Sequence, residues 1–323
     1  MVVSYESNNH DLMGTAMPRR KKSFSGNVND VDLRLMRVFK AVIECGGLSA
    51  AQAELGVGRS TISRQISDLE TRLGIRLCHR GRSGFSLTQQ GSQAYKYIDQ
   101  FLISAGEFAS NIASISNMMV GKIKIGMIDF TLTDTNNPLI PTIKQFKEIA
   151  PDVTVNLMTG SPNEVERGVI DGDLHIGIVP DYQRHPSLEY ATLFEEEVGL
   201  FCGSEHPLFQ AVRKNRPVTE KEIYQYKLVH RAYFECDRLR QRKQKFPVGS
   251  TAYQTEAVMA LVRSGVYLGF MPRHCQTFMG NELHELMPDV FGYSTPICAV
   301  WRTDRKHSQI MQDFLKILRE IGA

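Results

Sequence analysis

The amino-acid sequence predicts an N-terminal winged helix-turn-helix, a long linker helix and a C-terminal α/β domain of two lobes. Three observations lead to this prediction: two short amphipathic helices around a glycine turn, a long apolar stripe without proline, and strands that then alternate with helices. We expect a disordered basic tail at 1–29, the winged helix-turn-helix at 30–87, the linker helix at 88–119 and the two-lobed domain at 120–323.

Length and composition set the broad class. With 323 residues, of which 42% are hydrophobic, the chain has room for two or three domains. No apolar run approaches the roughly 20 residues that cross a bilayer, and the N-terminus lacks the apolar segment of a secretion signal. The six cysteines are scattered without a CxxC pair, which is typical of reduced thiols. We therefore expect a cytoplasmic protein with no membrane partner.

Positive charge is concentrated near the N-terminus. Residues 17–92 hold 13 Lys or Arg against 6 Asp or Glu, whereas the whole chain has a formal net charge of +3. A segment that binds phosphate requires such a concentration. The basic run at 18–22 is either solvated charge in the tail or an additional phosphate-contacting arm. Met17 is an alternative start of the chain.

The first predicted helix supports the helix-turn-helix. Asp32 is a candidate N-cap, and Gly46 and Gly47 mark the end of the helix. One apolar face is formed by Leu35, Met36, Phe39, Val42 and Ile43. This periodicity predicts a helix that packs beneath the next two.

Two short helices and a basic hairpin follow. Ser49 and Ser60 are candidate N-caps, Gly56 and Gly58 form the turn between the helices, and Gly74 ends the second one. The apolar face of the second helix consists of Ile62, Ile66, Leu69 and Leu73. The basic, glycine-rich stretch at 80–84 is typical of a wing that lies along phosphate. Together these features predict a winged helix-turn-helix.

The polar face of the second helix is the candidate DNA-binding surface. A helix N-terminus offers N–H groups to phosphate, while Arg64 and Gln65 are long enough to reach base edges. The alternative is a merely solvated face, which the glycine turn before it and the basic wing after it disfavour. The candidate DNA-binding residues are Arg59, Ser60, Thr61, Ser63, Arg64 and Gln65 in the helix and Arg80 and Arg82 in the wing.

The chain from about residue 31 to 321 resembles the LysR-type transcriptional regulators. The resemblance is carried by the run ISRQI at 62–66 and by Leu69-Glu70, Leu73-Gly74, Leu77, Arg80, Leu87-Thr88 and Gly91. It implies a homo-oligomeric activator that often regulates its own gene. Cys78 stands where the family usually has Phe, at an expected core position. Arg59 stands where the family usually has Gln, so the operator preference does not carry over.

The linker helix carries an apolar stripe. Residues 94–119 repeat apolar side chains at spacings of four and three, as in the seam between two long helices. The candidate dimerisation residues are Ile98, Phe101, Ala105, Phe108, Ile112 and Ile115, with Ala94 and Met119 at the ends of the stripe. Packing against the chain's own downstream domain is the alternative. We expect a homodimer, or a homotetramer built from it.

The C-terminal part alternates strands and helices. Strands are predicted at 122–129, 153–158 and 173–180, and Ser161, Pro162 and Glu164 form a helix start as N-cap, N1 and N3. This order implies parallel strands with right-handed crossovers. We expect lobe 1 at about 120–196 and 293–323 and lobe 2 at about 197–292. The chain thus passes from lobe 1 to lobe 2 and returns, and two lobes with two such connections resemble the bilobal fold of periplasmic binding proteins.

A cleft between the lobes is the expected effector site. Helix starts there favour a small polar or anionic ligand, although the nearby carboxylates of Asp129 and Asp134 oppose an anion unless they are paired. The alternative for each candidate residue is that it caps a helix or forms a turn and does not bind a ligand. The candidate effector-binding residues are Asp129, Phe130, Thr131, Thr133, Thr159, Gly160 and Ser161 in lobe 1 and, from position and the family pattern, His230, Arg231 and Thr251 in lobe 2.

Other classes of function lack their motifs. There is no HExxH, GxSxG, GxGxxG or P-loop sequence, and His175 on an alternating strand suits a core histidine. A redox-sensing regulator that uses Cys202 or Cys236 is a narrower alternative. We expect no enzyme activity, cofactor or metal. The predicted partners are double-stranded promoter DNA with inverted repeats, a small-molecule effector, a second copy of the chain and RNA polymerase.

Overall fold

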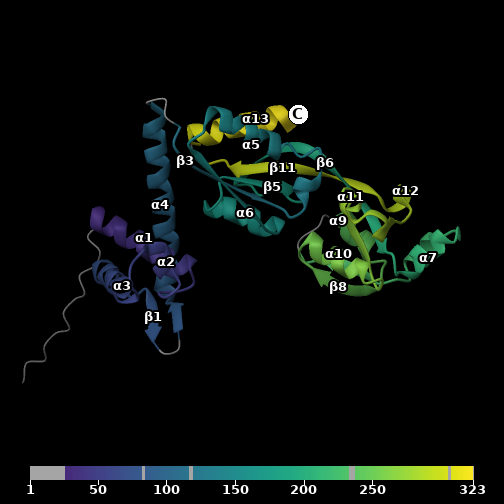
Figure 1. The fold of residues 1–323 in the computed structure, drawn as a ribbon, viewed down its shortest axis with the longest axis horizontal. Helices are drawn as coiled ribbons and strands as arrows, with labels where there is room; N and C mark the ends of the chain where they lie inside the picture. The colour runs from purple at the N-terminus through teal and green to yellow at the C-terminus, as the bar shows by residue number, and fades with distance from the viewer. Residues whose placement is uncertain (1–25, 82–83, 116–118, 233–236, 305–306, 323) are drawn as a thin grey trace, which may run out of the picture. The chain divides into compact units, whose positions relative to one another are not determined.

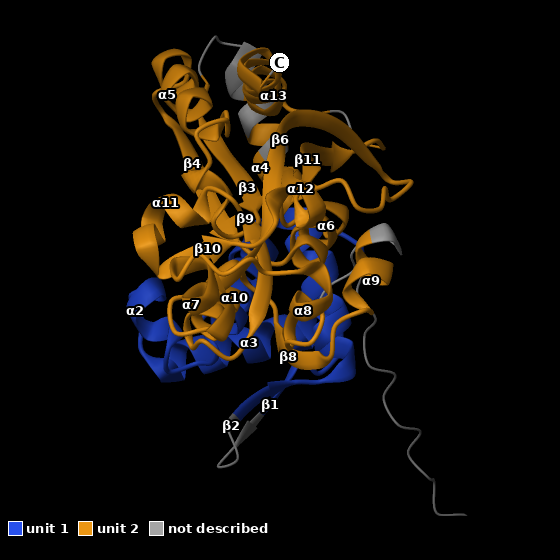
Figure 2. Cartoon of the chain, turned by 90° about the vertical axis from the view of Figure 1, so that its right-hand side faces the viewer, with its two compact units in different colours: residues 1–102 blue, residues 103–323 orange. Residues whose placement is uncertain are grey.

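The computed structural model describes residues 26–81, 84–115, 119–232, 237–304 and 307–322. The chain forms two compact units, residues 1–102 and residues 103–323 (Figure 2). Most of the predicted tail, including Met17 and the basic run at 18–22, lies outside the described residues, as do Arg82 and Cys236.

The first unit is a winged helix-turn-helix. Its elements are α1 Asp30–Glu44, α2 Ala51–Leu55, α3 Arg59–Leu73, β1 Cys78–Gly81, β2 Gly84–Leu87 and the start of α4 Gln89–Ile115. Strands β1 and β2 pair antiparallel as the wing. The predicted apolar faces meet in one core that includes Leu35, Phe39, Ile62, Ile66, Leu69 and Cys78. Burial of these faces therefore determines how the three short helices pack.

The helix starts in this unit differ from the predicted ones. Asn29, which the sequence assigned to the tail, caps α1, and Asp32 is the N3 member of its capping box. The N-cap of α3 is Gly58 and that of α2 is Ala50, and neither makes a side-chain cap bond. Asp32, Ser49 and Ser60 are therefore not N-caps. In α1 the reason is that an acid at N3 receives its bond from the N-cap backbone three residues earlier.

Helix α4 is shorter than the predicted linker helix. Its described part has 27 residues and ends at Ile115, so it is about 40 Å long. Met119 lies outside the helix and packs against the core of the second unit. The predicted stripe therefore does not continue to Met119.

The second unit is built on one nine-stranded sheet with the order β4-β3-β5-β11-β6-β9-β7-β8, to which β10 adds beside β6. The strands are β3 Gly121–Met127, β4 Val153–Thr159, β5 Ile176–Pro180, β6 Leu188–Gly203, β7 Leu228–Arg231, β8 Val248–Ala252, β9 Leu268–Pro272, β10 Leu283–Glu285 and β11 Tyr293–Arg302. Strands β3 to β5 are parallel, as are β7 to β9, whereas β6 and β11 are antiparallel to each other.

Helices cover both parts of this sheet. They are α5 Leu139–Ile149, α6 Pro162–Asp171, α7 Pro207–Arg213, α8 Glu220–Ile223, α9 Asp237–Lys243, α10 Thr255–Arg263, α11 Cys275–Met279, α12 Pro288–Phe291 and α13 Gln309–Gly322, with short 3₁₀ turns η1 Thr131–Thr133 and η2 Gly280–Glu282. Figure 1 shows α5 and α13 on one face of the first part and α6 on the other. Helix α6 begins with the predicted capping box of Ser161 and Glu164, with Pro162 at N1.

Two strands connect the lobes. We use lobe 1 for β3–β5 with α5, α6 and α13 and the loops that join them, and lobe 2 for β7–β10 with α7–α12. Strand β6 contributes Leu193 to the core of lobe 1 and Leu200 to that of lobe 2, and β11 returns with Tyr293 and Ile297. The predicted two crossings are thus two neighbouring, hydrogen-bonded strands.

Candidate functional site

Helix α3 presents the predicted polar face. Arg59, Ser60, Thr61 and Arg64 are exposed and Ser63 is half-buried, while Ile62 and Ile66 on the other side are fully buried. The backbone N–H of Arg59 donates to the side-chain Oε1 of Gln52 at 2.9 Å, which joins the start of α3 to α2. The first turn of α3 is therefore fixed to its neighbour and open to a ligand.

Gln65 departs from the rest of this face. Its side chain is half-buried, and its Oε1 atom is buried without a hydrogen-bond partner among the described residues. To accept from a base with this oxygen, Gln65 would have to change rotamer. Arg64 needs no such change.

Two acidic side chains hold α3 in place. The guanidinium of Arg72 at the end of α3 contacts the buried carboxylate of Asp32 in α1, with Nη2 to Oδ2 at 3.1 Å. This hydrogen bond lowers the pKa of Asp32. Glu70 accepts from the backbone N–H groups of Leu77 and Cys78 at 2.8 and 3.2 Å. These contacts, which the sequence did not reveal, fix α3 to α1 and to the base of the wing.

The wing is described only in part. Arg80 lies in β1 opposite Phe85, but its side chain is not described. Arg82, at the tip, lies outside the described residues. The predicted phosphate contacts of the wing therefore stay predictions.

The apolar stripe of α4 divides into two parts. Ile98 is 5% exposed and belongs to the core of the first unit, so its assignment as a dimerisation residue was wrong. Phe101, Phe108 and Ile112 are 40, 67 and 50% exposed. Ala105 is half-buried, and the side chain of Ile115 is not described. Only the part after Ile98 offers an apolar surface to another helix.

A salt bridge fixes the buried part of α4 to α1. The ammonium of Lys40 contacts Asp99, a carboxylate that is itself buried, and also Glu44 at 3.0 Å. Both carboxylates hold the pKa of Lys40 above its ordinary value. A charged pair that includes a buried carboxylate resists separation, because the remaining charge would be poorly solvated.

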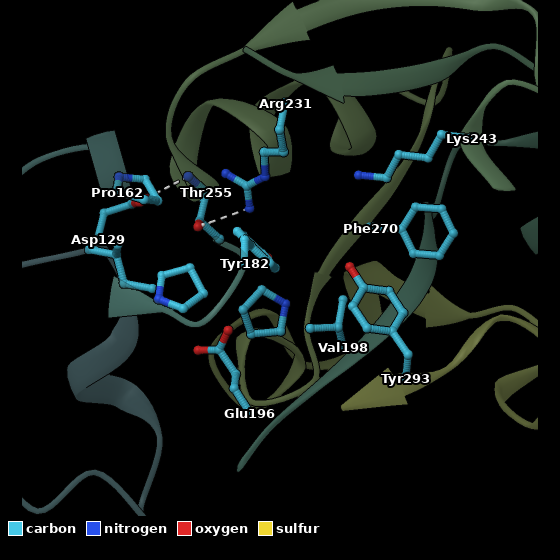
Figure 3. Close-up of a pocket in the computed structure, with 13 residues that line it drawn as sticks. Asp129, Pro162, Tyr182, Glu196, Val198, Arg231, Lys243, Thr255, Phe270 and Tyr293 are labelled. Carbon is cyan, nitrogen blue, oxygen red and sulfur yellow. Dashed lines mark hydrogen bonds between the residues drawn. The ribbon is translucent and has the colours of Figure 1, made fainter. Parts of the chain in front are cut away.

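In the second unit a pocket lies where the two lobes meet (Figure 3). Lobe 1 contributes Asp129, Pro162 and Tyr182; the crossing strands contribute Glu196, Val198 and Tyr293; lobe 2 contributes Arg231, Lys243, Thr255 and Phe270. The cavity volume is about 30 Å³, enough for roughly two water molecules. This is a small, polar site with four charged side chains.

Two of the ten predicted effector-binding residues line this pocket: Asp129 and Arg231. Phe130 has φ +62° and packs its ring edge-on against Phe278 of lobe 2. Thr131 is buried and accepts from Asn137 Nδ2 at 3.1 Å. Thr133 Oγ1 lies 2.6 Å from His274 Nδ1. These three residues shape the connection between the lobes and do not line the cavity.

The remaining five predicted residues are not among the residues that line the pocket. Thr159 is exposed at the end of β4, Gly160 is buried, and Ser161 caps α6 through its bond from the Glu164 N–H. His230 and Thr251 are register partners in β7 and β8. The sequence left two alternative roles open for Ser161, effector binding and helix capping. The structure fits helix capping better.

Sequence reasoning missed several lining residues. Glu196 lies within three consecutive glutamates, and Lys243 ends the basic run DRLRQRK, so both resembled solvated charge. In the structure they are 6 and 3% exposed. Alternation along β6 points Glu196 inward and its two neighbours outward, a signal that the sequence did contain.

One hydrogen bond beside the pocket connects the lobes: the carboxylate of Asp129 in lobe 1 accepts from the backbone N–H of Thr255 in lobe 2 (Figure 3). Within lobe 2, Arg231 Nη2 donates to Thr255 Oγ1 at 3.1 Å. His274 Nε2 lies 3.4 Å from Glu196 Oε1. The N-terminus of α10 is thus already hydrogen-bonded to a carboxylate of lobe 1.

The structure weakens the redox alternative. Cys202 is fully buried, and burial raises the pKa of its thiol to about 12, so the reactive thiolate is suppressed. His175 Nδ1 accepts from the backbone N–H of Lys124 at 2.8 Å, a structural role. Among the described residues, no cluster of three or more His, Cys, Asp or Glu side chains could hold a metal. No helix in the described part is long and apolar enough to span a membrane.

The chain is similar to known regulators in both parts. Residues 33–92 match the family described as bacterial regulatory helix-turn-helix protein, lysR family, and residues 117–323 match the LysR substrate binding domain. The HTH-type transcriptional activator BauR of Pseudomonas aeruginosa is 32% identical over 302 residues, which cover 93% of this chain and 98% of that protein.

Solved structures share the fold. Full-length CbnR complexed with its target DNA gives a TM-score of 0.63 at 20% identity, over 90% of this chain and 99% of that one. A full-length OxyR variant from Pseudomonas aeruginosa gives a TM-score of 0.55 at 17% identity, over 90 and 94% of the two chains.

Proposed function

The chain belongs to the LysR family of DNA-binding transcriptional regulators with an effector-binding domain, and from this premise we propose that it activates transcription from promoters with inverted repeats as a homodimer or homotetramer. Helix α3 enters the major groove, the wing follows the phosphate backbone, and a small molecule binds in the cleft of the second unit. RNA polymerase is the proposed partner at the promoter, and the cytoplasm is the proposed location.

The exposed first turn of α3 is the observation that carries the DNA-binding part. Ser60 and Thr61 lie where the free N–H groups of a helix start meet phosphate, and Arg64 projects from the same face. Because Asp32 and Glu70 brace the other side of the unit, the helix keeps its orientation when it meets DNA. A base contact by Arg64 then selects a sequence.

The oligomer follows from the uncovered side of α4. Phe108 and Ile112 expose apolar surface one turn apart, and a second α4 covers such a stripe by two-fold pairing. Two recognition helices then meet two half-sites, which is why we propose inverted repeats.

The effector part rests on the pocket between the lobes. Its lining comes from both lobes, so a ligand there changes the balance between open and closed arrangements. In an oligomer held through these units, that change alters the spacing of the recognition helices and the bend of the promoter DNA.

Footprinting on the DNA upstream of the protein's own gene tests the proposal, at two salt concentrations and with candidate metabolites. We expect a protected inverted repeat that persists at the higher salt concentration and changes its pattern when an effector is present. Protection without sequence preference that disappears at the higher salt concentration would reduce the chain to nonspecific phosphate binding.

A further inference from the structure

The pocket between the lobes carries two charges of each sign. Arg231 and Lys243 are the cations and Asp129 and Glu196 the anions. Lys243 and Glu196 are almost completely buried. Charged side chains that line a cavity can form charge-assisted hydrogen bonds with a ligand that is itself charged, and such bonds are stronger than those between neutral groups.

The charges are separated in space. Figure 3 shows Arg231 and Lys243 approaching the cavity from one side and the carboxylate of Glu196 from the opposite side. Asp129 is engaged by the backbone of Thr255. The pocket is therefore polarised, with a cationic end and an anionic end marked by Glu196.

Aromatic rings also belong to the lining of the pocket. Phe270 and Tyr293 line the cavity, and the ammonium of Lys243 lies 5.3 Å from the centre of the Phe270 ring. Tyr182 completes the aromatic lining from lobe 1. Ring faces attract an ammonium group, and they also exclude water from the charged ends.

The geometry points to a ligand class: we propose that this pocket selects a small amino acid, whose carboxylate meets Arg231 and Lys243 and whose ammonium meets Glu196. The inference rests on the proposed function, because it names the effector of the same cleft. The cavity of about 30 Å³ limits the ligand to a few heavy atoms unless the lobes separate.

Simpler charged molecules fit the pocket less well. A monocarboxylate satisfies the two cations but brings no positive charge to Glu196. A primary amine meets Glu196 but leaves Arg231 and Lys243 facing an uncharged group. A monocarboxylate and a primary amine therefore each lose one of the two charge contacts that an amino acid makes. The charged group left unmatched in the pocket discriminates against them.

Titration of the full-length protein with matched compounds tests this selection. The probes are glycine, L-alanine, 4-aminobutyrate and 5-aminopentanoate, each beside the carboxylate and the amine that lack one of its charged groups. For L-alanine these are propionate and ethylamine. We expect at least one amino acid to raise the melting temperature and to bind at least tenfold tighter than both of its analogues.

Variants assign the two ends of the ligand. Glu196→Gln should weaken amino acid binding at least tenfold while leaving carboxylate binding unchanged or tighter. Lys243→Gln should weaken carboxylates and amino acids and leave amines unaffected. Glu195→Gln and Lys245→Gln are the controls, since both side chains are exposed neighbours of the tested ones. Melting temperatures without ligand report whether each variant is folded.

The outcomes separate the two proposals. If monocarboxylates bind as tightly as the amino acids, or if no probe binds, the ligand class is wrong, even when the footprint on the operator is intact. If the footprint lacks sequence preference, the proposed regulator function fails, whatever the titrations give.

Discussion

The carboxylate of Asp129, two residues after strand β3 of lobe 1, accepts a hydrogen bond from the backbone N–H of Thr255, the first residue of α10 in lobe 2. The N-cap residue of α10, Gln254, makes no side-chain cap bond. Asp129 therefore caps a helix of the other lobe. An anionic ligand that approaches this helix start meets a carboxylate that is already in place, so the start of α10 does not attract an anion as an uncapped helix would.

Removal of this cap should loosen the second unit. Asp129→Ala removes the acceptor of the Thr255 N–H at the start of α10, so we expect the free energy of unfolding to fall by about 1 kcal/mol. Urea unfolding of the full-length protein measures this change. Asp152→Ala, at an exposed position, serves as the control and should have little effect. Equal stability of the two variants would show that the Asp129 contact contributes nothing.

Base recognition should depend on Arg64. We expect Arg64→Ala to weaken operator binding by about 1–3 kcal/mol and to relax the preference at one base position. Binding curves on the operator and on single-base variants measure both effects. Arg167→Ala removes an exposed arginine from the second unit and should leave the curves unchanged. Unaltered operator binding by Arg64→Ala would remove this side chain from recognition.

Oligomer formation should depend on the exposed part of α4. Phe108→Asp removes a large apolar side chain and adds a charge, so we expect dimer association to weaken by at least about 1.5–3 kcal/mol. Sedimentation equilibrium gives the dissociation constant. Gln100→Asp adds the same charge at an exposed position outside the stripe and should leave the dimer intact. A Phe108→Asp protein that associates like the wild type would favour another interface.

Buried His206 should make stability depend on pH. Its Nδ1 accepts from the Leu208 N–H, and burial lowers the pKa of its imidazole to about 4. In the unfolded chain this group binds a proton near pH 6.5, so the unfolded state gains protons first as the pH falls. This contribution to stability is therefore complete above about pH 6.5 and decreases toward pH 4, by on the order of 3 kcal/mol in total.

Denaturant unfolding from pH 7 to pH 4 checks this expectation. His206→Asn keeps an acceptor at the N-cap of α7 but cannot titrate, so its stability should change less over this range than that of the wild type. His185→Asn replaces an exposed histidine and should follow the wild-type curve. Parallel curves for His206→Asn and the wild type would contradict the proposed role of burial.

Local signals predicted most of the fold. The capping box of Ser161 and Glu164, the glycine turn at Gly56 and the apolar face of α3 act within a few residues, so the sequence displays them directly. The predicted start of α1 was wrong because two polar residues competed for the cap, and Asn29 took the position assigned to Asp32. The sequence alone could not decide between them. The starts of α2 and α3 were wrong for another reason, since Ala50 and Gly58 stand at the N-cap without a side-chain bond.

The pocket was predicted less completely, because its residues come from distant segments. Asp129 was found since it ends a strand that faces the expected cleft. Lys243 was missed because its position depends on how α9 packs against β9, a contact between segments more than 20 residues apart that no local pattern encodes. Because the packing of α9 buries Lys243, its charge lines the pocket and does not lie on the surface.

The paired strands β6 and β11 restrict how the lobes can move. A ladder of hydrogen bonds links these two strands, and its register shifts between Ile297 and Cys298, near the middle of the ladder. Irregularities of this kind bend a strand and interrupt the ladder locally. We therefore expect the connection to bend at this point when the angle between the lobes changes, whichever ligand is bound.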